Sequence, residues 1–330
     1  MAGRRTNVAL FAALAMAFLT GALAFAIGSG WNRWATAAHA IAGFVIVLLI
    51  PWKSVIARRG LRRRRGGRVT SVAFAILVAA AVVSGVLHST GLIAMGGLSS
   101  MQIHVGAALI AIPLAAMHVV GRRVRLHRSD ASRRQLLRSG AFIAGAAVTY
   151  AVVEGGSKLA SLPGGARRFT GSFEAGSFDP DEMPVTQWLN DSVPAIDPED
   201  WTLAIGGRAL TYDDVSQWAD GVTATLDCTG GWWAEQEWSG VLLSRLLPAD
   251  TNGRSIVVAS ATGYERRFPI EDASKLLLAT GAAGRPLSPG HGYPARLVAP
   301  GRRGFWWVKW VVGIEVSDRP WWIQSPFPVS

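Results

Sequence analysis

The sequence predicts a membrane α-helical bundle of four to five spans followed by a separate α+β domain. Two observations predict this architecture: the long apolar runs are confined to the first half of the 330-residue chain, and charge is divided unevenly between the halves. Residues 1–155 hold 18 Lys and Arg against 2 Asp and Glu, whereas residues 156–330 hold 15 against 20. Because 50% of the residues are hydrophobic and only 17% are charged, the composition excludes a disordered chain.

Four apolar runs predict the first four helices. Residues 8–27 supply about the 20 residues that a helix needs to cross a bilayer. Similar runs follow at approximately 35–50, 69–86 and 101–120. The bundle is therefore expected to contact membrane lipid.

The basic residues stand between these runs, mostly in loops at residues 53–68 and 122–138. Loops rich in Lys and Arg stay in the cytoplasm, and Arg4 and Arg5 put the N-terminus on the same side. A nucleic-acid-binding protein would gather its basic residues on one face, so no nucleic-acid partner is predicted. We expect a multi-pass protein of the cytoplasmic (inner) membrane.

A weaker apolar run at residues 140–153 predicts an uncleaved fifth span. The preceding residues 132–138 resemble the twin-arginine export signal, whose route carries folded proteins. The alternative is one more positively charged cytoplasmic loop. Five crossings would leave the C-terminal domain on the extracytoplasmic side. The predicted segments are the membrane bundle at 1–130, the twin-arginine-like segment with the fifth span at 131–155, a linker at 156–180 and the C-terminal domain at 181–330.

Four histidines lie in or at the edges of the spans: His39, His88, His104 and His118. Ionisable groups at such depth are functional candidates. His39 and His104 lie at about the same predicted depth, near the outer ends of the second and fourth spans. Two imidazoles at one depth suit a haem iron, which takes one axial nitrogen from each face. The alternative is a polar contact between helices without a metal.

This pattern resembles the membrane cytochrome b subunits of formate dehydrogenases and related hydrogenases, whose fourth helix carries a histidine near each end. The resemblance implies that His39 and His104 bind one outer haem b, with His88 and His118 as alternative ligands. In that pattern a histidine on the first helix pairs with the inner one on the fourth, but residues 8–27 contain none. One haem b is therefore predicted, exchanging electrons with a quinone or quinol pool.

The second half has shorter apolar runs and frequent turn residues, which predict an α+β domain. Strands are expected at residues 202–205 and 255–260, and short helices at 212–218, capped by Thr211, and at 239–247.

Cys228, the only cysteine of the chain, stands between a predicted strand and two glycines. It cannot form an intramolecular disulfide. A thiolate in this setting can reach a bulky partner, and soft thiolate ligands favour transition metals. On chemistry alone the alternative is a buried, unreactive cysteine.

Several ordered motifs around Cys228 resemble the sulfite oxidase superfamily of molybdopterin enzymes. They are Trp-Leu-Asn-Asp-Ser-Val-Pro at 188–194, Trp-Thr-Leu at 201–203, the cysteine followed by Trp-Ser-Gly-Val-Leu-Leu at 238–243, Gly-Arg-Pro-Leu at 284–287, the stretch 290–300, and Val-Lys-Trp at 308–310. The resemblance covers roughly residues 180–318. It implies a sulfite-oxidase-like molybdopterin domain in which Cys228 binds molybdenum and the cofactor contacts Asn190, Thr229, His291, Arg296 and Lys309.

These residue types suit that cofactor. Arg296 can form a bidentate contact with the pterin phosphate, and Lys309 and His291 can add donors. Asn190 can hydrogen-bond the cofactor. Tyr264 is the candidate catalytic residue that lines the substrate funnel.

The chain also departs from the family pattern, because Leu189-Asn190-Asp191 stands where sulfite oxidases have Arg-Asn-His. Sulfite oxidases also carry a tyrosine before a later turn, and this chain lacks that tyrosine at the corresponding place near Thr280. We therefore expect a molybdopterin-dependent oxidoreductase that exchanges electrons between haem b, the quinone pool and a molybdenum site, and transfers an oxygen atom on a small-molecule S-oxide or N-oxide. The alternatives are a sulfite-type dehydrogenase with the opposite electron flow and a non-catalytic membrane-tethered binding module.

Overall fold

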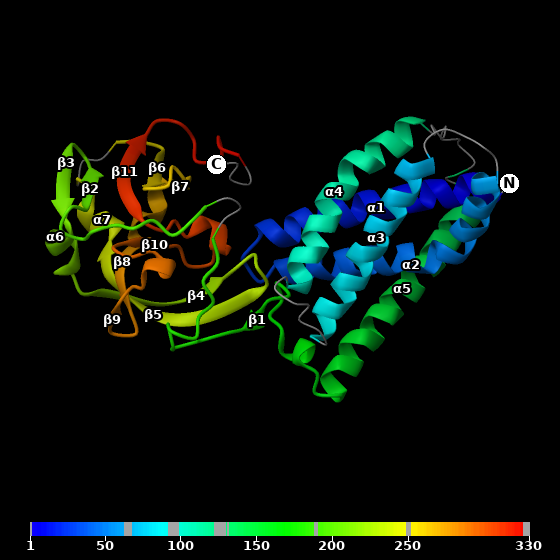
Figure 1. The fold of residues 1–330 in the computed structure, drawn as a ribbon, viewed down its shortest axis with the longest axis horizontal. Coiled ribbons are helices and arrows are strands. Elements are labelled where there is room, and N and C mark those ends of the chain that lie inside the picture. Colours follow the sequence, from blue (N-terminus) through cyan, green and yellow to red (C-terminus); the bar gives the residue numbers. More distant parts are fainter. Residues whose placement is uncertain are drawn as a thin grey trace. The chain divides into compact units, whose positions relative to one another are not determined.

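The computed structural model describes residues 2–62, 68–91, 99–121, 130, 132–187, 191–248 and 252–325. The chain forms two compact units. The helical unit comprises Met1–Phe25 and Gly30–Phe173, and the sheet unit comprises Ala26–Ser29 and Glu174–Ser330. Figure 1 shows the helices of the first unit and the strands of the second.

Within the described residues, five long helices build the helical unit. They are α1 (Ala2–Ala26), α2 (Asn32–Arg62), α3 (Arg68–Thr90), α4 (Ser100–Gly121) and α5 (Arg133–Leu159). The first covers all of its predicted span except residue 27, and each of the other four contains a predicted span in full. All five are long and apolar enough to cross a membrane. Helix α3 packs along α4, and α2 packs along α5.

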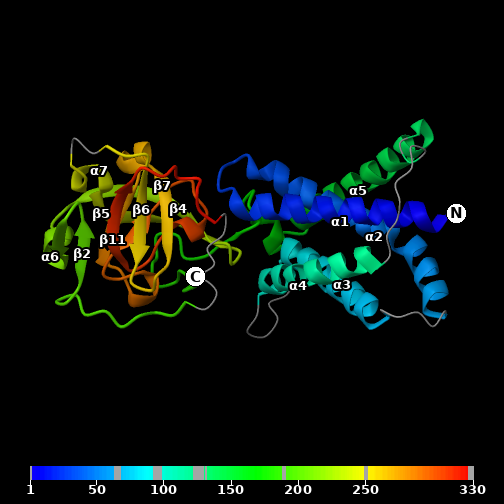
Figure 2. The ribbon, with the colours of Figure 1, turned by 90° about the horizontal axis from the view of Figure 1, so that it is seen from above.

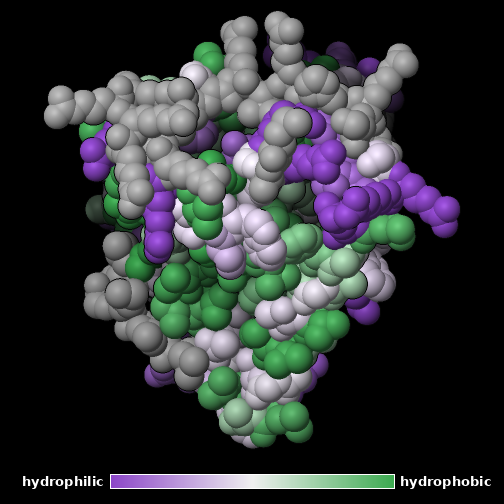
Figure 3. Space-filling view, turned by 90° about the vertical axis from the view of Figure 1, so that its right-hand side faces the viewer, coloured by the Kyte–Doolittle hydropathy of each residue, from purple (hydrophilic) through white to green (hydrophobic). Residues whose placement is uncertain are grey.

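The outer surface of the helical unit is apolar. Large hydrophobic side chains such as Leu19, Val69 and Leu137 are more than half exposed. Figure 3 shows apolar side chains over much of one face, with hydrophilic ones gathered near one end. Helices that are apolar on all sides need an apolar surrounding, so this surface is compatible with a membrane protein.

An ion pair joins the start of α1 to the segment between α4 and α5. Arg4 donates from Nη1 and Nη2 to the two carboxylate oxygens of Asp130, at 2.7 and 2.5 Å. Asp130 and the start of α1 therefore lie at the same end of the bundle, which is compatible with the expectation that both face the cytoplasm.

The sheet unit contains two sheets. The first has the order β1 (Phe173–Glu174), β5 (Trp232–Leu242), β8 (Leu277–Ala282) and β10 (Arg296–Val298), with β4 (Asp220–Asp227) paired to β5 and β9 (Arg285–Pro286) paired to β8. The second has the order β3 (Arg208–Thr211), β2 (Thr202–Ile205), β11 (Val311–Ser317), β6 (Ser255–Ser260) and β7 (Glu265–Pro269). Strand β11 pairs in parallel with β2 and antiparallel with β6, which lies beside β7 (Figure 2).

Most local predictions for the sheet unit are confirmed. Strands β2 and β6 have the predicted bounds, and α6 (Tyr212–Ser216) begins after a capping box formed by Thr211 and Asp214. The predicted helix at 239–247 is wrong in its first half. Strand β5 continues to Leu242 because it pairs with β4 on one side and β8 on the other, and only α7 (Leu243–Leu246) is helical.

The predicted linker at 156–180 contains regular structure. Helix α5 runs to Leu159, a short 3₁₀ helix covers Pro163–Ala166, and β1 follows. Arg167 pairs with Glu154 at 2.5 Å and donates from Nε to the Gly164 carbonyl at 2.8 Å, which ties this segment to the end of α5.

Candidate active site

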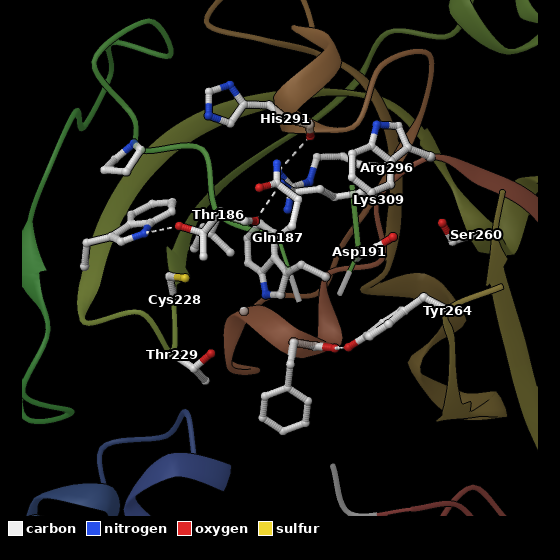
Figure 4. A pocket seen from close by; sticks show the side chains of 17 residues that line it. Thr186, Gln187, Asp191, Cys228, Thr229, Ser260, Tyr264, His291, Arg296 and Lys309 are labelled. Carbon is white, nitrogen blue, oxygen red and sulfur yellow. Dashed lines mark hydrogen bonds between the residues drawn. The ribbon is translucent and has the colours of Figure 1, made fainter. Parts of the chain in front are cut away.

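The sheet unit contains a pocket where β4 ends, and segments far apart in the sequence line it. Figure 4 shows Cys228 and Thr186 on one side, Asp191, Ser260 and Tyr264 on the other, and Arg296 and Lys309 above them. The full lining is Pro184, Thr186, Gln187, Asp191, Leu226, Cys228, Thr229, Trp232, Ser260, Tyr264, His291, Arg296, Gly304, Phe305, Trp307, Lys309 and Trp310.

Cys228 follows the last residue of β4 and starts a tight turn. Its backbone N–H donates to the Trp232 carbonyl at 2.8 Å, and the Gly230 N–H donates to its sulfur at 3.3 Å. The side chain is buried, with 9% of the residue exposed. Burial raises the pKa of the thiol, and the nearby positive charges of Arg303 and Lys309 act in the opposite direction.

A buried ion pair holds this turn in place. Arg303 donates from Nη1 to the Asp227 carboxylate at 2.5 Å and from Nη2 to the Cys228 carbonyl at 3.3 Å. The next residue is Gly304, where a Cβ would lie 3.0 Å from the Cα of Cys228. The absence of a side chain at Gly304 therefore allows the two backbone segments to approach closely.

Arg296 is the most deeply buried cation of the pocket. It is 1% exposed and its guanidinium carbon lies 5.0 Å from the centre of the Trp238 ring. Nη1 donates to the His291 carbonyl at 3.0 Å, but within the described part of the chain Nε has no acceptor. Burial lowers the pKa of Arg296 to about 9.

Lys309 lies beside Arg296 and is bonded to backbone carbonyls. Its Nζ donates to Thr186 at 2.9 Å and to Gly290 at 2.6 Å. Burial, and then the positive charge of Arg296, lower the pKa of Lys309 to about 7. An anion in the pocket would stabilise the protonated forms of both side chains.

His291 uses both ring nitrogens within the protein. Nε2 donates to the Met183 carbonyl at 3.0 Å, and Nδ1 lies 2.8 Å from the Ser288 hydroxyl. Burial, followed by the charges of Arg296 and Lys309, lowers the pKa of His291 to about 4, so the ring is neutral at pH 7.

The remaining predicted residues of this site have different outcomes. Tyr264 lines the pocket, is 7% exposed, and donates its hydroxyl proton to the Phe305 carbonyl. Thr229 also lines the pocket. Asn190 lies outside the described residues. The structure thus brings together Cys228, Thr229, Tyr264, His291, Arg296 and Lys309.

Sequence reasoning missed Thr186 and Gln187. Both stand in an irregular segment, and no motif marks them. The Gln187 side-chain nitrogen is buried and has no acceptor among the residues that the structure describes. Together with Arg296, Gln187 offers unused N–H groups to a ligand in the pocket.

In the helical unit, the structure brings His39 and His104 together. Their Nε2 atoms lie 3.4 Å apart, and the rings are nearly perpendicular at 89°. The Nδ1 of His39 bonds the Ala17 carbonyl at 2.8 Å, and that of His104 bonds the Ala81 carbonyl at 2.7 Å. A carbonyl can only accept, so Nδ1 of each ring carries a proton and the two Nε2 atoms face each other. If both rings are neutral, two lone pairs face each other, and they repel unless a proton or a metal cation lies between them.

The two halves of this pair repeat one local design. Ala17 is followed four residues later by Gly21 on α1, and Ala81 by Gly85 on α3. A Cβ at either glycine would lie 3.0 Å from the histidine ring that reaches the neighbouring carbonyl. A glycine on each helix thus makes room for the ring.

The other two candidate histidines lie apart from this pair. His88 bonds the Gly171 carbonyl through Nε2 at 2.9 Å, and Nδ1 of His118 lies 3.3 Å from the Ser71 hydroxyl. Across the described ranges, no three His, Cys, Asp or Glu side chains gather as a metal site. The predicted metal ligands that remain candidates are His39, His104 and Cys228.

Comparisons with known proteins concern the C-terminal half. Residues 190–324 match the oxidoreductase molybdopterin binding domain. The chain is 47% identical to the nitrate reductase [NADPH] of Mycosarcoma maydis over 18% of this chain and 6% of that protein. It is 29% identical to the mitochondrial sulfite oxidase of Drosophila melanogaster over 38% of this chain and 29% of that protein. The sulfane dehydrogenase SoxCD structure from Paracoccus pantotrophus matches with 29% identity over 38% of this chain and 40% of that chain, at a TM-score of 0.36.

The C-terminal half therefore matches the molybdopterin binding domain of oxidoreductases, and the chain spans less than a third of the length of the nitrate reductase and the sulfite oxidase that it resembles. The pocket fits such a cofactor. It combines one soft sulfur ligand with buried cations, and the Nε of Arg296 and the amide of Gln187 are unused donors for an anionic group rich in heteroatoms.

Proposed function

We propose that the protein is a membrane-bound enzyme that passes electrons from quinol through a haem b to molybdenum, where a small S-oxide or N-oxide loses its oxygen atom. The observation that carries this proposal is the pocket that combines Cys228 with the buried cations Arg296 and Lys309. The histidine pair of the apolar helical unit supplies the second redox site.

Each cofactor would use a small set of residues. Cys228 would bind molybdenum, Arg296 and Lys309 would bind the pterin phosphate, and Gln187 would hydrogen-bond the pterin. When bound, the molybdenum–pterin group supplies the oxygen-atom and electron transfer chemistry. The protein contributes binding, orientation and a pocket of fixed charge.

His39 and His104 would hold a haem b, which would supply one-electron transfer. The Nδ1–H groups are held by backbone carbonyls, which orients the rings and leaves both Nε2 lone pairs for iron. The glycines at 21 and 85 keep both rings in this orientation by leaving space beside them.

The charge on the side of the pocket opposite Cys228 favours a neutral substrate over an anion. Asp191 lies opposite Cys228 and accepts a hydrogen bond from the Thr262 hydroxyl at 3.2 Å, and Thr262 in turn lies 3.1 Å from the Ser260 hydroxyl. Because the Thr262 and Tyr264 protons are directed at protein acceptors, this side offers mainly acceptors and a negative charge. Anions such as sulfite and nitrate are disfavoured there.

The electrons and protons balance in this direction of flow. Quinol becomes quinone and releases two electrons and two protons. The S-oxide takes up the two electrons and two protons, its sulfur–oxygen bond breaks, and the products are a sulfide and water. With the N-terminus in the cytoplasm and five crossings, the reaction would take place outside the inner membrane.

The test is metal analysis and turnover of the full chain purified in detergent. We expect molybdenum near one per chain, a reduced haem b spectrum, and quinol oxidation that depends on neutral S-oxides or N-oxides. Sulfite-dependent quinone reduction would instead establish the opposite flow. Protein without molybdenum in a host that makes the cofactor would contradict the proposal.

A further inference from the structure

Trp232 and Thr186 form a hydrogen-bonded pair beside the sulfur of Cys228. The indole Nε1 of Trp232 donates to the Thr186 hydroxyl oxygen at 3.0 Å, and Thr186 and Cys228 line the same pocket. An indole N–H can only donate, so it occupies an acceptor position of Thr186 and leaves the hydroxyl proton for the sulfur. Figure 4 shows Thr186 beside Cys228 with this indole bond drawn.

The sulfur also accepts a hydrogen bond from its own turn. The Gly230 N–H lies 3.3 Å from it, and the turn is closed by the bond from the Cys228 N–H to the Trp232 carbonyl. Two segments distant in sequence therefore place a donor group beside one sulfur atom. The Thr186 hydroxyl belongs to a side chain, so it can be removed without changing the backbone of the turn.

Thr186 is fixed from its backbone as well. Its carbonyl accepts from Lys309 Nζ at 2.9 Å, so one residue connects the candidate metal ligand with a candidate cofactor-binding cation. Thr186 precedes residues 190–324, which carry the match to the molybdopterin binding domain. Thr186 therefore belongs to the segment that comes before the matched domain in this chain.

We propose that Thr186 is a positioning residue that donates a hydrogen bond to the metal-bound sulfur of Cys228 and thereby raises the reduction potential of molybdenum. The inference rests on the proposed function, because it requires Cys228 to bind the metal. A hydrogen bond withdraws electron density from a thiolate, which then donates less to the metal and stabilises its reduced form. A higher potential favours delivery of electrons from quinol to this site.

The test is a redox titration of the Mo(VI)/Mo(V) couple in the full-length enzyme loaded with its molybdenum cofactor. Electron paramagnetic resonance monitors the amount of Mo(V) at each potential. Thr186→Val keeps the shape and removes the hydroxyl. It should shift the equilibrium toward Mo(VI) by about tenfold, equivalent to about 59 mV for one electron. Thr186→Ser should restore the wild-type potential.

The matched control is Thr225→Val on β4. The Thr225 hydroxyl bonds Glu235 at 3.4 Å and Thr225 does not line the pocket, so this variant should keep the wild-type potential. Thr186→Ala is a second hydroxyl-free variant and should shift the potential in the same direction as Thr186→Val. Loss of molybdenum from both hydroxyl-free variants, with full loading of Thr186→Ser, would also support a hydroxyl directed at the sulfur.

An unchanged potential in loaded Thr186→Val or Thr186→Ala overturns the inference, and so does failure of Thr186→Ser to restore it. Molybdenum content measured on the same samples separates this result from the proposed function. Wild-type protein without molybdenum refutes the proposed function, whereas loaded variants with wild-type potentials refute only the role of Thr186.

Discussion

The helical unit and the sheet unit present their candidate ligands in different ways. In the helical unit two equivalent histidines come from α2 and α4, and carbonyls of α1 and α3 orient them. In the sheet unit a single sulfur follows a strand, and cations, an ion pair and a hydroxyl from other segments surround it. The helical site depends on regular geometry, whereas the pocket depends on contacts between distant segments.

This difference explains what the sequence could predict. His39 and His104 were predicted as a pair because the depth of a residue follows from its position along a helix. Their supporting glycines carry no such signal, because small residues are common in apolar helices. Their role emerges only when the helices are packed together.

In the pocket, motifs predicted Cys228, Arg296 and Lys309, but the residues that position them could not be found. Asp227 and Arg303 each resemble an ordinary surface charge until the fold buries them as a pair. Thr186 lies in an irregular segment whose path depends on tertiary contacts. The helix expected at 239–247 failed for the same reason, because pairing with β4 and β8 overrides local preference.

The largest effect that separates the two units is expected from Cys228→Ser. Turnover should be abolished, because a hydroxyl is a poor replacement for a soft thiolate ligand. The haem b spectrum should remain that of the wild type, since the substitution lies in the other unit. Turnover assays and reduced-minus-oxidised spectra of the same preparation check this. Wild-type turnover would remove Cys228 from the mechanism.

The reciprocal experiment is His39→Ala or His104→Ala. If this pair holds the proposed haem b, each variant should lose it, because one of the two ligands is removed, while molybdenum content stays near that of the wild type. Haem and molybdenum assays on one sample measure the content of each cofactor per chain. If His88→Ala or His118→Ala removes the haem instead, the ligand assignment is wrong.

A smaller effect is expected from Lys309→Met in cofactor-free protein. The pKa of Lys309 is about 7 in the fold and near 10.5 when unfolded, so the unfolded chain binds more protons between these values. The lysine therefore destabilises the fold near neutral pH, and this penalty decreases as the pH rises. Relative to Lys309→Met, the wild type should gain about 2 kcal/mol in free energy of unfolding between about pH 7 and 9. Denaturation at both pH values checks this, and a constant difference would show that the fold does not lower the pKa of Lys309.

The smallest effect is expected from Asp191→Asn, which tests the charge opposite Cys228. Removing one negative charge should tighten binding of sulfate by about tenfold, or ~1.4 kcal/mol, measured as inhibition and as quenching of tryptophan fluorescence. Asp197→Asn is the matched control, because Asp197 is exposed and does not line the pocket. Equal sulfate affinity in the wild type and Asp191→Asn would exclude Asp191 as a determinant of substrate charge.

The most direct measurement is X-ray absorption at the molybdenum edge, on the wild type and on Cys228→Ser. If the sulfur at position 228 binds the metal, the wild-type spectrum will contain one molybdenum–sulfur contact more than the variant. Identical sulfur coordination in two fully loaded samples would contradict the account.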